Sequence, residues 1–81
     1  MKKKAKKVYY RDDDFLIKIG NKIRDLRTAK GMTQMELAFK CNDMDYSQIN
    51  RMELGKINFS ASYFLIIAKA LEVGPKKLLP D

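Results

Sequence analysis

Histidine is absent from the 81 residues, and cysteine occurs once, at Cys41. Histidine is the most frequent general base in enzymes, and no serine, cysteine or carboxylate in this sequence has an evident activating partner. A glycine-rich loop that could hold phosphates is also missing. These absences argue against an enzyme, and we expect neither a cofactor nor a small-molecule effector.

Long apolar stretches and a second cysteine are missing as well. A membrane span needs about eighteen apolar residues in a row, and no run approaches that length. The basic start is followed by acids, where an export signal would be apolar. A single cysteine cannot form an internal disulfide, so we expect a cytoplasmic protein.

The excess of positive charge lies at one end of the chain. The formal net charge is +7, but residues 1–11 hold six of the seventeen cations and no acid, which leaves eleven cations against ten acids in residues 12–81. We therefore divide the chain into a flexible basic tail, residues 1–11, and one small domain, residues 12–81. Within the domain, binding of nucleic acid must depend on where individual side chains lie.

Two interpretations of the basic tail stay open. As an arm, it would follow the phosphates of DNA or enter a minor groove. As a charged terminal segment, it would only keep the protein soluble. The cations in question are Lys2, Lys3, Lys4, Lys6 and Lys7.

Two short helices joined by a turn are predicted near the middle of the chain. Thr33 and Glu36 have the spacing of a capping box, which predicts a helix from residue 34 to about residue 41. Leu37, Ala38 and Cys41 form its apolar stripe. Asn42 and Asp43 tolerate a left-handed backbone and mark the turn.

The second of these helices is predicted over residues 45–54, with Asp45 as its cap and Gly55 as its end. Its apolar side holds Ile49, Met52 and Leu54. Its other side is dense in amides and hydroxyls and has one guanidinium: Tyr46, Ser47, Gln48, Asn50 and Arg51. Ordinary exposed helix faces are richer in Lys and Glu, whereas amides and hydroxyls suit contacts to base edges in a major groove.

Further helices are predicted on both sides of this pair. The acids of residues 12–14 suit the start of a first helix that runs to residue 29 and ends at Gly31. A metal site at these acids is disfavoured, because no other ligands cluster near them. Gly20 inside this helix either marks a close helix contact or has no particular role.

After the pair, Ser60 can cap a helix over residues 61–72, which Gly74 ends, and residues 76–79 form a last turn. Phe64, Ile67, Ala68 and Leu71 give this helix an apolar core face. The domain is therefore expected to be all-α, a compact bundle of about five short helices.

The segments TQMELA, SQINRMELGK, NFS and LIIAKALEV resemble the phage repressor and Cro-type (Xre) helix-turn-helix family over about residues 15–79. The resemblance implies a lambda-repressor-like fold in which residues 45–54 are the recognition helix. Two features depart from the family pattern. The segment from Ala38 to Ile49 is one residue longer, with Asn42 where the family usually has glycine, and Phe59 stands where proline is frequent.

The resemblance also implies contacts to DNA phosphates. Gln34 matches the family position that donates to a phosphate and braces the recognition helix. Lys56 and Asn58 lie in a loop that runs beside the DNA backbone in the family, and we add Thr33 to these phosphate candidates.

Arg51 and Glu53 match the family's Arg-x-Glu. Arg51 would reach a phosphate or a guanine, while Glu53 is expected to pair with a neighbouring cation, because an acid close to phosphates is repelled. From its chemistry, Gln48 is the best candidate to contact an adenine or a water-bridged base.

A twofold dimer on two half-sites would raise both affinity and specificity. We expect a homodimer that uses Val73, Leu78 and Leu79, with Tyr63 or Phe59 as possible additions. Alternatively, the two leucines only close the core of one chain.

The function expected from the residues and the resemblance is a sequence-specific transcription regulator on double-stranded DNA. It would be a small repressor, or a controller like those that accompany restriction and modification genes. The alternative is an antitoxin or another protein-interaction module built on the same fold. The short tail argues against an antitoxin, which would more often have a long segment that folds on its partner.

Deleting residues 2–7 separates the two interpretations of the tail. If these lysines bind phosphates, the plot of log affinity against log salt becomes shallower, by about 0.9 for each phosphate that is no longer neutralised. A salt titration of DNA binding by the full-length and shortened chains measures this slope. An unchanged slope would leave the tail with a solubilising role only.

Overall fold

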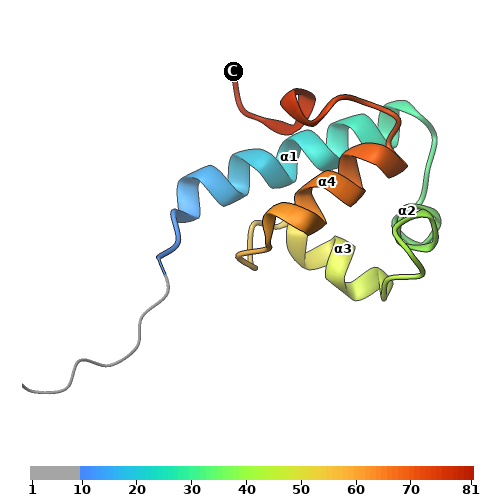
Figure 1. Ribbon diagram of the computed structural model, residues 1–81, viewed down its shortest axis with the longest axis horizontal. Coiled ribbons are helices and arrows are strands. Elements are labelled where there is room, and N and C mark those ends of the chain that lie inside the picture. The colour runs from blue at the N-terminus through green and yellow to red at the C-terminus, as the bar shows by residue number, and fades with distance from the viewer. Residues whose placement is uncertain (1–9) are drawn as a thin grey trace, which may run out of the picture.

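The computed structural model describes residues 10–81, so the expected tail lysines lie outside the described residues. The chain forms α1 (Asp13–Ala29), α2 (Gln34–Lys40), α3 (Tyr46–Glu53), α4 (Ala61–Ala70) and the 3₁₀ helix η1 (Pro75–Leu78). The described part contains no strand, and the expected all-α class is confirmed. In Figure 1, α3 and η1 lie on opposite sides of α1, and η1 also packs against α4.

Each α-helix begins at a capping side chain that the sequence predicts. Asp12 accepts a hydrogen bond from the amide of Phe15, so it serves as a cap. Thr33 and Glu36 form the complete capping box, with bonds of 3.0 and 2.8 Å. The two remaining α-helices are capped by Asp45 and Ser60.

The ends of α1 and α3 also follow the prediction. Gly31 and Gly55 take left-handed backbone angles, with φ of 69° and 72°. In each case the two amides that follow the last helical turn bond back to its carbonyls, as in a Schellman motif.

The end predicted for α4 is wrong. The helix ends at Ala70 instead of residue 72, and the left-handed residue after it is Glu72 (φ 59°), not Gly74. The amides of Glu72 and Val73 still bond back to the last turn at 3.0 Å, so the Schellman motif closes without a glycine. Gly74 is extended instead, which is the conformation favoured before Pro75.

The longer turn between α2 and α3 contains two successive left-handed residues. Asn42 and Asp43 have φ of 60° and 61°, in agreement with the expectation from their side chains. The carbonyl of Ala38 accepts from the amide of Met44, which is one residue later than the corresponding bond after α1 or α3. The additional residue is therefore absorbed in the turn, and α3 begins directly after its predicted cap.

The core is formed by the apolar stripes of all four helices, with η1 closing one side. Its fully buried members are Ile23, Leu37, Ile49, Met52, Ile67, Ala68, Leu71 and Leu78, and Cys41 is only 1% exposed. Burial raises the pKa of the Cys41 thiol to about 11. Leu54, expected on the buried side of α3, is 48% exposed, because α3 ends one residue before it.

Gly20 marks a very close contact between α1 and the end of α3. A Cβ built on Gly20 would lie 2.4 Å from the carbonyl oxygen of Met52 and 2.5 Å from that of Glu53. Both atoms belong to the backbone and cannot rotate away. The first of the two interpretations of Gly20, a close helix contact, is therefore confirmed.

Gly20→Ala should lower the free energy of unfolding by about 1 to 3 kcal/mol, because α3 must move away from α1. This destabilisation is expected although alanine favours a helix by about 1 kcal/mol over glycine. Urea unfolding followed by circular dichroism measures it. Gly74→Ala is the control, since a Cβ there meets no atom within 4 Å; equal stabilities of the two variants would contradict the close approach of the helices.

Candidate nucleic-acid interface

A buried ion pair joins α1 to the end of α3. The Nε and Nη2 of Arg27 donate to the two carboxylate oxygens of Glu53 at 2.6 and 3.0 Å, with side chains only 11% and 3% exposed. The hydrogen bond to Glu53 raises the pKa of Arg27. The third nitrogen of Arg27 donates to the carbonyl of Met32 at 2.7 Å, which ties down the segment before α2. Such a bidentate pair fixes geometry as well as charge.

Gln34, at the start of α2, completes this network. Its amide nitrogen donates to Glu53 at 2.9 Å and lies 3.5 Å from the side-chain oxygen of Asn50. The expected bracing of the recognition helix by Gln34 is therefore present. Its contact to a phosphate stays a prediction.

The expectation that Glu53 pairs with a cation is confirmed, but the sequence does not identify that cation. The spacing of two residues could have identified it. Arg27 follows Ile23 by four residues and Glu53 follows Ile49 by four, so each charged residue lies on the same helix face as a core isoleucine. A cation and an acid on two buried stripes must pair, since an unpaired buried charge is costly.

The five side chains predicted to contact bases lie on the side of α3 away from the core. Tyr46 is 51% exposed, Asn50 and Arg51 are exposed, and Ser47 and Gln48 are half-buried. The Nη1 of Arg51 donates to the Oε1 of Gln48 at 2.6 Å. The structure thus brings amide, hydroxyl, phenol and guanidinium groups together on one exposed face.

The start of α3 is held by Asp45. Its carboxylate accepts from the amide of Ser47 at 3.0 Å. This bond, with a smaller contribution from the charge of Arg51, lowers the pKa of Asp45. The ionised cap is therefore present at neutral pH and disappears only as the pH falls through this lowered pKa.

The loop after α3 is bound to the segment before α1. The Nη2 of Arg11 lies 3.5 and 3.3 Å from the carbonyls of Gly55 and Lys56, and the Asn58 amide donates to the Tyr10 carbonyl at 2.7 Å. Arg11, placed in the tail by the sequence, thus contacts the domain. The side chain of Lys56 is exposed. The side-chain nitrogen of Asn58 already donates one hydrogen bond, to Tyr10.

The residues expected at the dimer surface separate into two kinds. Leu78 is fully buried in the core, so its side chain is unavailable to a partner and closes the core, in line with the alternative interpretation. Val73 is half-buried and Leu79 is 41% exposed. Leu79 borders an apolar groove that is also lined by four aromatic residues, Tyr10, Phe15, Phe59 and Phe64.

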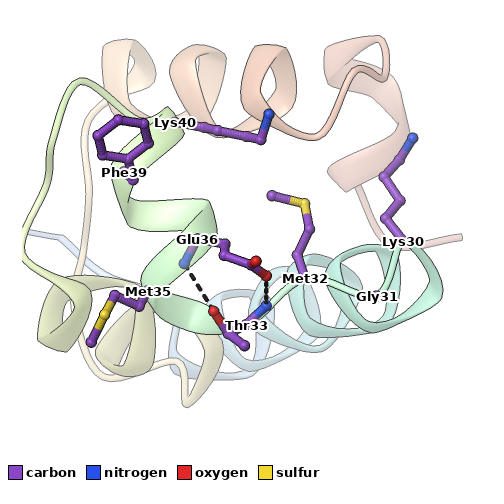
Figure 2. A pocket seen from close by; sticks show the side chains of 8 residues that line it. All are labelled: Lys30, Gly31, Met32, Thr33, Met35, Glu36, Phe39 and Lys40. Carbon is purple, nitrogen blue, oxygen red and sulfur yellow. Dashed lines mark hydrogen bonds between the residues drawn. The ribbon is translucent and has the colours of Figure 1, made fainter.

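The outer side of α2 carries a second apolar surface, shown in Figure 2. Met35 and Phe39 are 63% and 72% exposed, and both border a hollow next to the capping box. Lys30 and Lys40 lie at its edge. Thr33, a phosphate candidate, lines this hollow too, with its amide and hydroxyl oxygen engaged by Glu36.

Residues 10–81, the described part of the chain, lack two features, a cluster of metal ligands and a helix suited to membrane insertion. No group of three or more histidine, cysteine, aspartate or glutamate residues in this part could hold a metal ion. None of its helices combines the length and apolar character needed to span a bilayer.

The helix-turn-helix family model HTH_3 matches residues 23–78. The restriction-modification controller protein C.AhdI from Aeromonas hydrophila is 41% identical, with 79% of this chain and 96% of that one covered and a TM-score of 0.76. The controller protein C.Esp1396I, solved as a tetramer with its natural 35-base-pair operator, is 35% identical, with coverage of 78% and 82% and a TM-score of 0.71.

A hypothetical transcription factor, NHTF from Neisseria, is 28% identical, with 90% of this chain and 84% of that one covered and a TM-score of 0.74. Comparison with the curated proteins gave no significant match.

Arg27→Met should lower the free energy of unfolding by about 3 to 5 kcal/mol, because it leaves the Glu53 charge buried and unpaired. Denaturant unfolding measures this change. The control is Arg24→Met, since that side chain is 47% exposed and pairs only weakly with Asp25. The double variant with Glu53→Met should be more stable than Arg27→Met alone; a double variant that is less stable would contradict the paired arrangement.

Proposed function

The chain belongs to the HTH_3 helix-turn-helix family, and we propose that it is a sequence-specific, DNA-binding transcription regulator with no catalytic role. The observation that carries the proposal is the exposed face of α3, where five groups suited to base edges gather on a helix whose other side is fixed to α1 and α2. A regulator of this kind acts in the cytoplasm.

In the proposed complex α3 enters the major groove, with Tyr46, Ser47, Gln48, Asn50 and Arg51 at the bases. Gln34 and Thr33 at the start of α2, and Lys56 and Asn58 after α3, contact phosphates on the two sides of the groove. The network around Glu53 supports this arrangement, because Gln34 and Asn50 are joined within it. The hydrogen-bonded pair of helices α2 and α3 would therefore present the base contacts and the phosphate contacts together.

The basic tail continues from Tyr10, which Asn58 holds against the loop after α3. The tail therefore joins the domain next to Lys56, on the same side as a proposed phosphate contact. This position favours the interpretation of the tail as a DNA arm over the solubilising one.

We also propose that the chain binds DNA as a homodimer. The groove between the starts of α1 and α4, with Phe15 and Leu79 each about 40% exposed, supplies an apolar surface near the chain end. Tyr63, at 43%, extends the exposed apolar area on α4. Two copies would read two half-sites related by a twofold axis. The tetramer reported for C.Esp1396I on its operator is consistent with assembly in this family.

A second candidate function is binding of a protein partner, as in an antitoxin. The outer side of α2 favours it, because two large apolar side chains, Met35 and Phe39, are exposed there without serving the core. Thr33, a proposed phosphate contact, lines the same hollow, so a partner bound there would lie next to the proposed DNA face.

Selection of the full-length protein against random duplex DNA tests the proposal. We expect a pseudo-palindrome with half-sites about one helical turn apart. Asn50→Asp should weaken binding to the selected site about tenfold or more, because it places a negative charge on the groove face. The matched control, Asn21→Asp, makes the same change on an exposed part of α1 near the chain end. Enrichment of no sequence would refute the proposal and favour the protein partner.

A further inference from the structure

A hydrogen bond between Gln48 and Arg51 fixes the position of the Arg51 guanidinium on the exposed face of α3. The two residues are three positions apart on one helix, and Nη1 of Arg51 donates to Oε1 of Gln48 at 2.6 Å. A hydrogen bond from a charged donor is short and strong compared with one between neutral groups. It holds the guanidinium along α3, on the side facing the start of the helix.

The bond also changes what each side chain can offer to a base. A free glutamine recognises adenine with its oxygen and its amide N–H together. Here the oxygen already accepts from Arg51, while the guanidinium keeps about four of its five N–H groups and the amide keeps both of its own. The pair therefore presents mainly donors.

Among the major-groove edges, guanine offers two acceptors side by side, N7 and O6, whereas adenine and cytosine each present an N–H group. A cation surrounded by donors is repelled by those N–H groups and matches guanine. We propose that Arg51 contacts a guanine in each half-site and that Gln48 is the residue that positions it. This proposal rests on the proposed function, and it replaces the expectation that Gln48 contacts adenine.

Three variants test the proposal in the same selection. Arg51→Met should abolish a guanine preference of about 10- to 100-fold at one position of the half-site and leave the other positions unchanged. Gln48→Met removes the accepting oxygen and should reduce that preference several-fold. Gln48→Glu restores an acceptor, so the guanine preference should return while affinity falls on every sequence because of repulsion from phosphates.

A chemical probe separates a base contact from a phosphate contact. Replacing the selected guanine by 7-deazaguanine removes N7 and should weaken binding by the wild-type protein about tenfold, but leave binding by Arg51→Met unchanged. Lys77→Met is the charge control: it removes an exposed cation from η1, which lies on the other side of α1 from α3 (Figure 1). This variant should keep the full guanine preference.

The outcomes are distinguishable. If Arg51→Met weakens binding equally on all sequences and keeps the wild-type motif, Arg51 contacts a phosphate and the proposal is wrong. If Gln48→Met keeps an undiminished guanine preference, Gln48 does not position Arg51 and the proposal is wrong in that part. If the wild-type protein selects no motif, the proposed function itself fails, and this is visible before any variant is made.

Discussion

The close contact between the end of α3 and the middle of α1 determines the rest of the arrangement. It exists because Gly20 has no Cβ, which lets the carbonyls of Met52 and Glu53 approach the α1 backbone. At this distance the Glu53 carboxylate reaches Arg27, and Arg27 in turn reaches the carbonyl of Met32. One missing side-chain atom thus places the recognition helix, the first helix and the segment before α2 relative to one another.

The same contact explains why a longer turn does not disturb the recognition helix. The buried face of α3 is fixed by Ile49 and Met52 in the core and, at the last residue of the helix, by the ion pair of Glu53. A rotation of α3 would break the ion pair and expose these side chains. The turn therefore has to adapt, and it does so with two left-handed residues, Asn42 and Asp43, whose short polar side chains tolerate that conformation.

Features determined by neighbours in the sequence were predictable. Caps such as Thr33 and Asp45 act within three residues, and apolar stripes follow helical spacing. Features that depend on distant contacts were not. The burial of Arg27 needs Glu53 from another helix. The early end of α4 depends on a left-handed backbone at Glu72, a conformation that the sequence would assign to a glycine instead of a glutamate. The close packing at Gly20 was visible only as one of two interpretations.

The ion pair also has an electrostatic consequence for the proposed DNA face. Residues 12–81 are almost neutral, with eleven cations against ten acids, so the domain has little general attraction for phosphates. An unpaired acid at the end of α3 would repel the DNA backbone at the point where we propose that Lys56 binds it. Arg27 neutralises Glu53 from inside the protein. No unpaired acid at the end of α3 therefore opposes the proposed contacts of Arg51 and Lys56 with DNA.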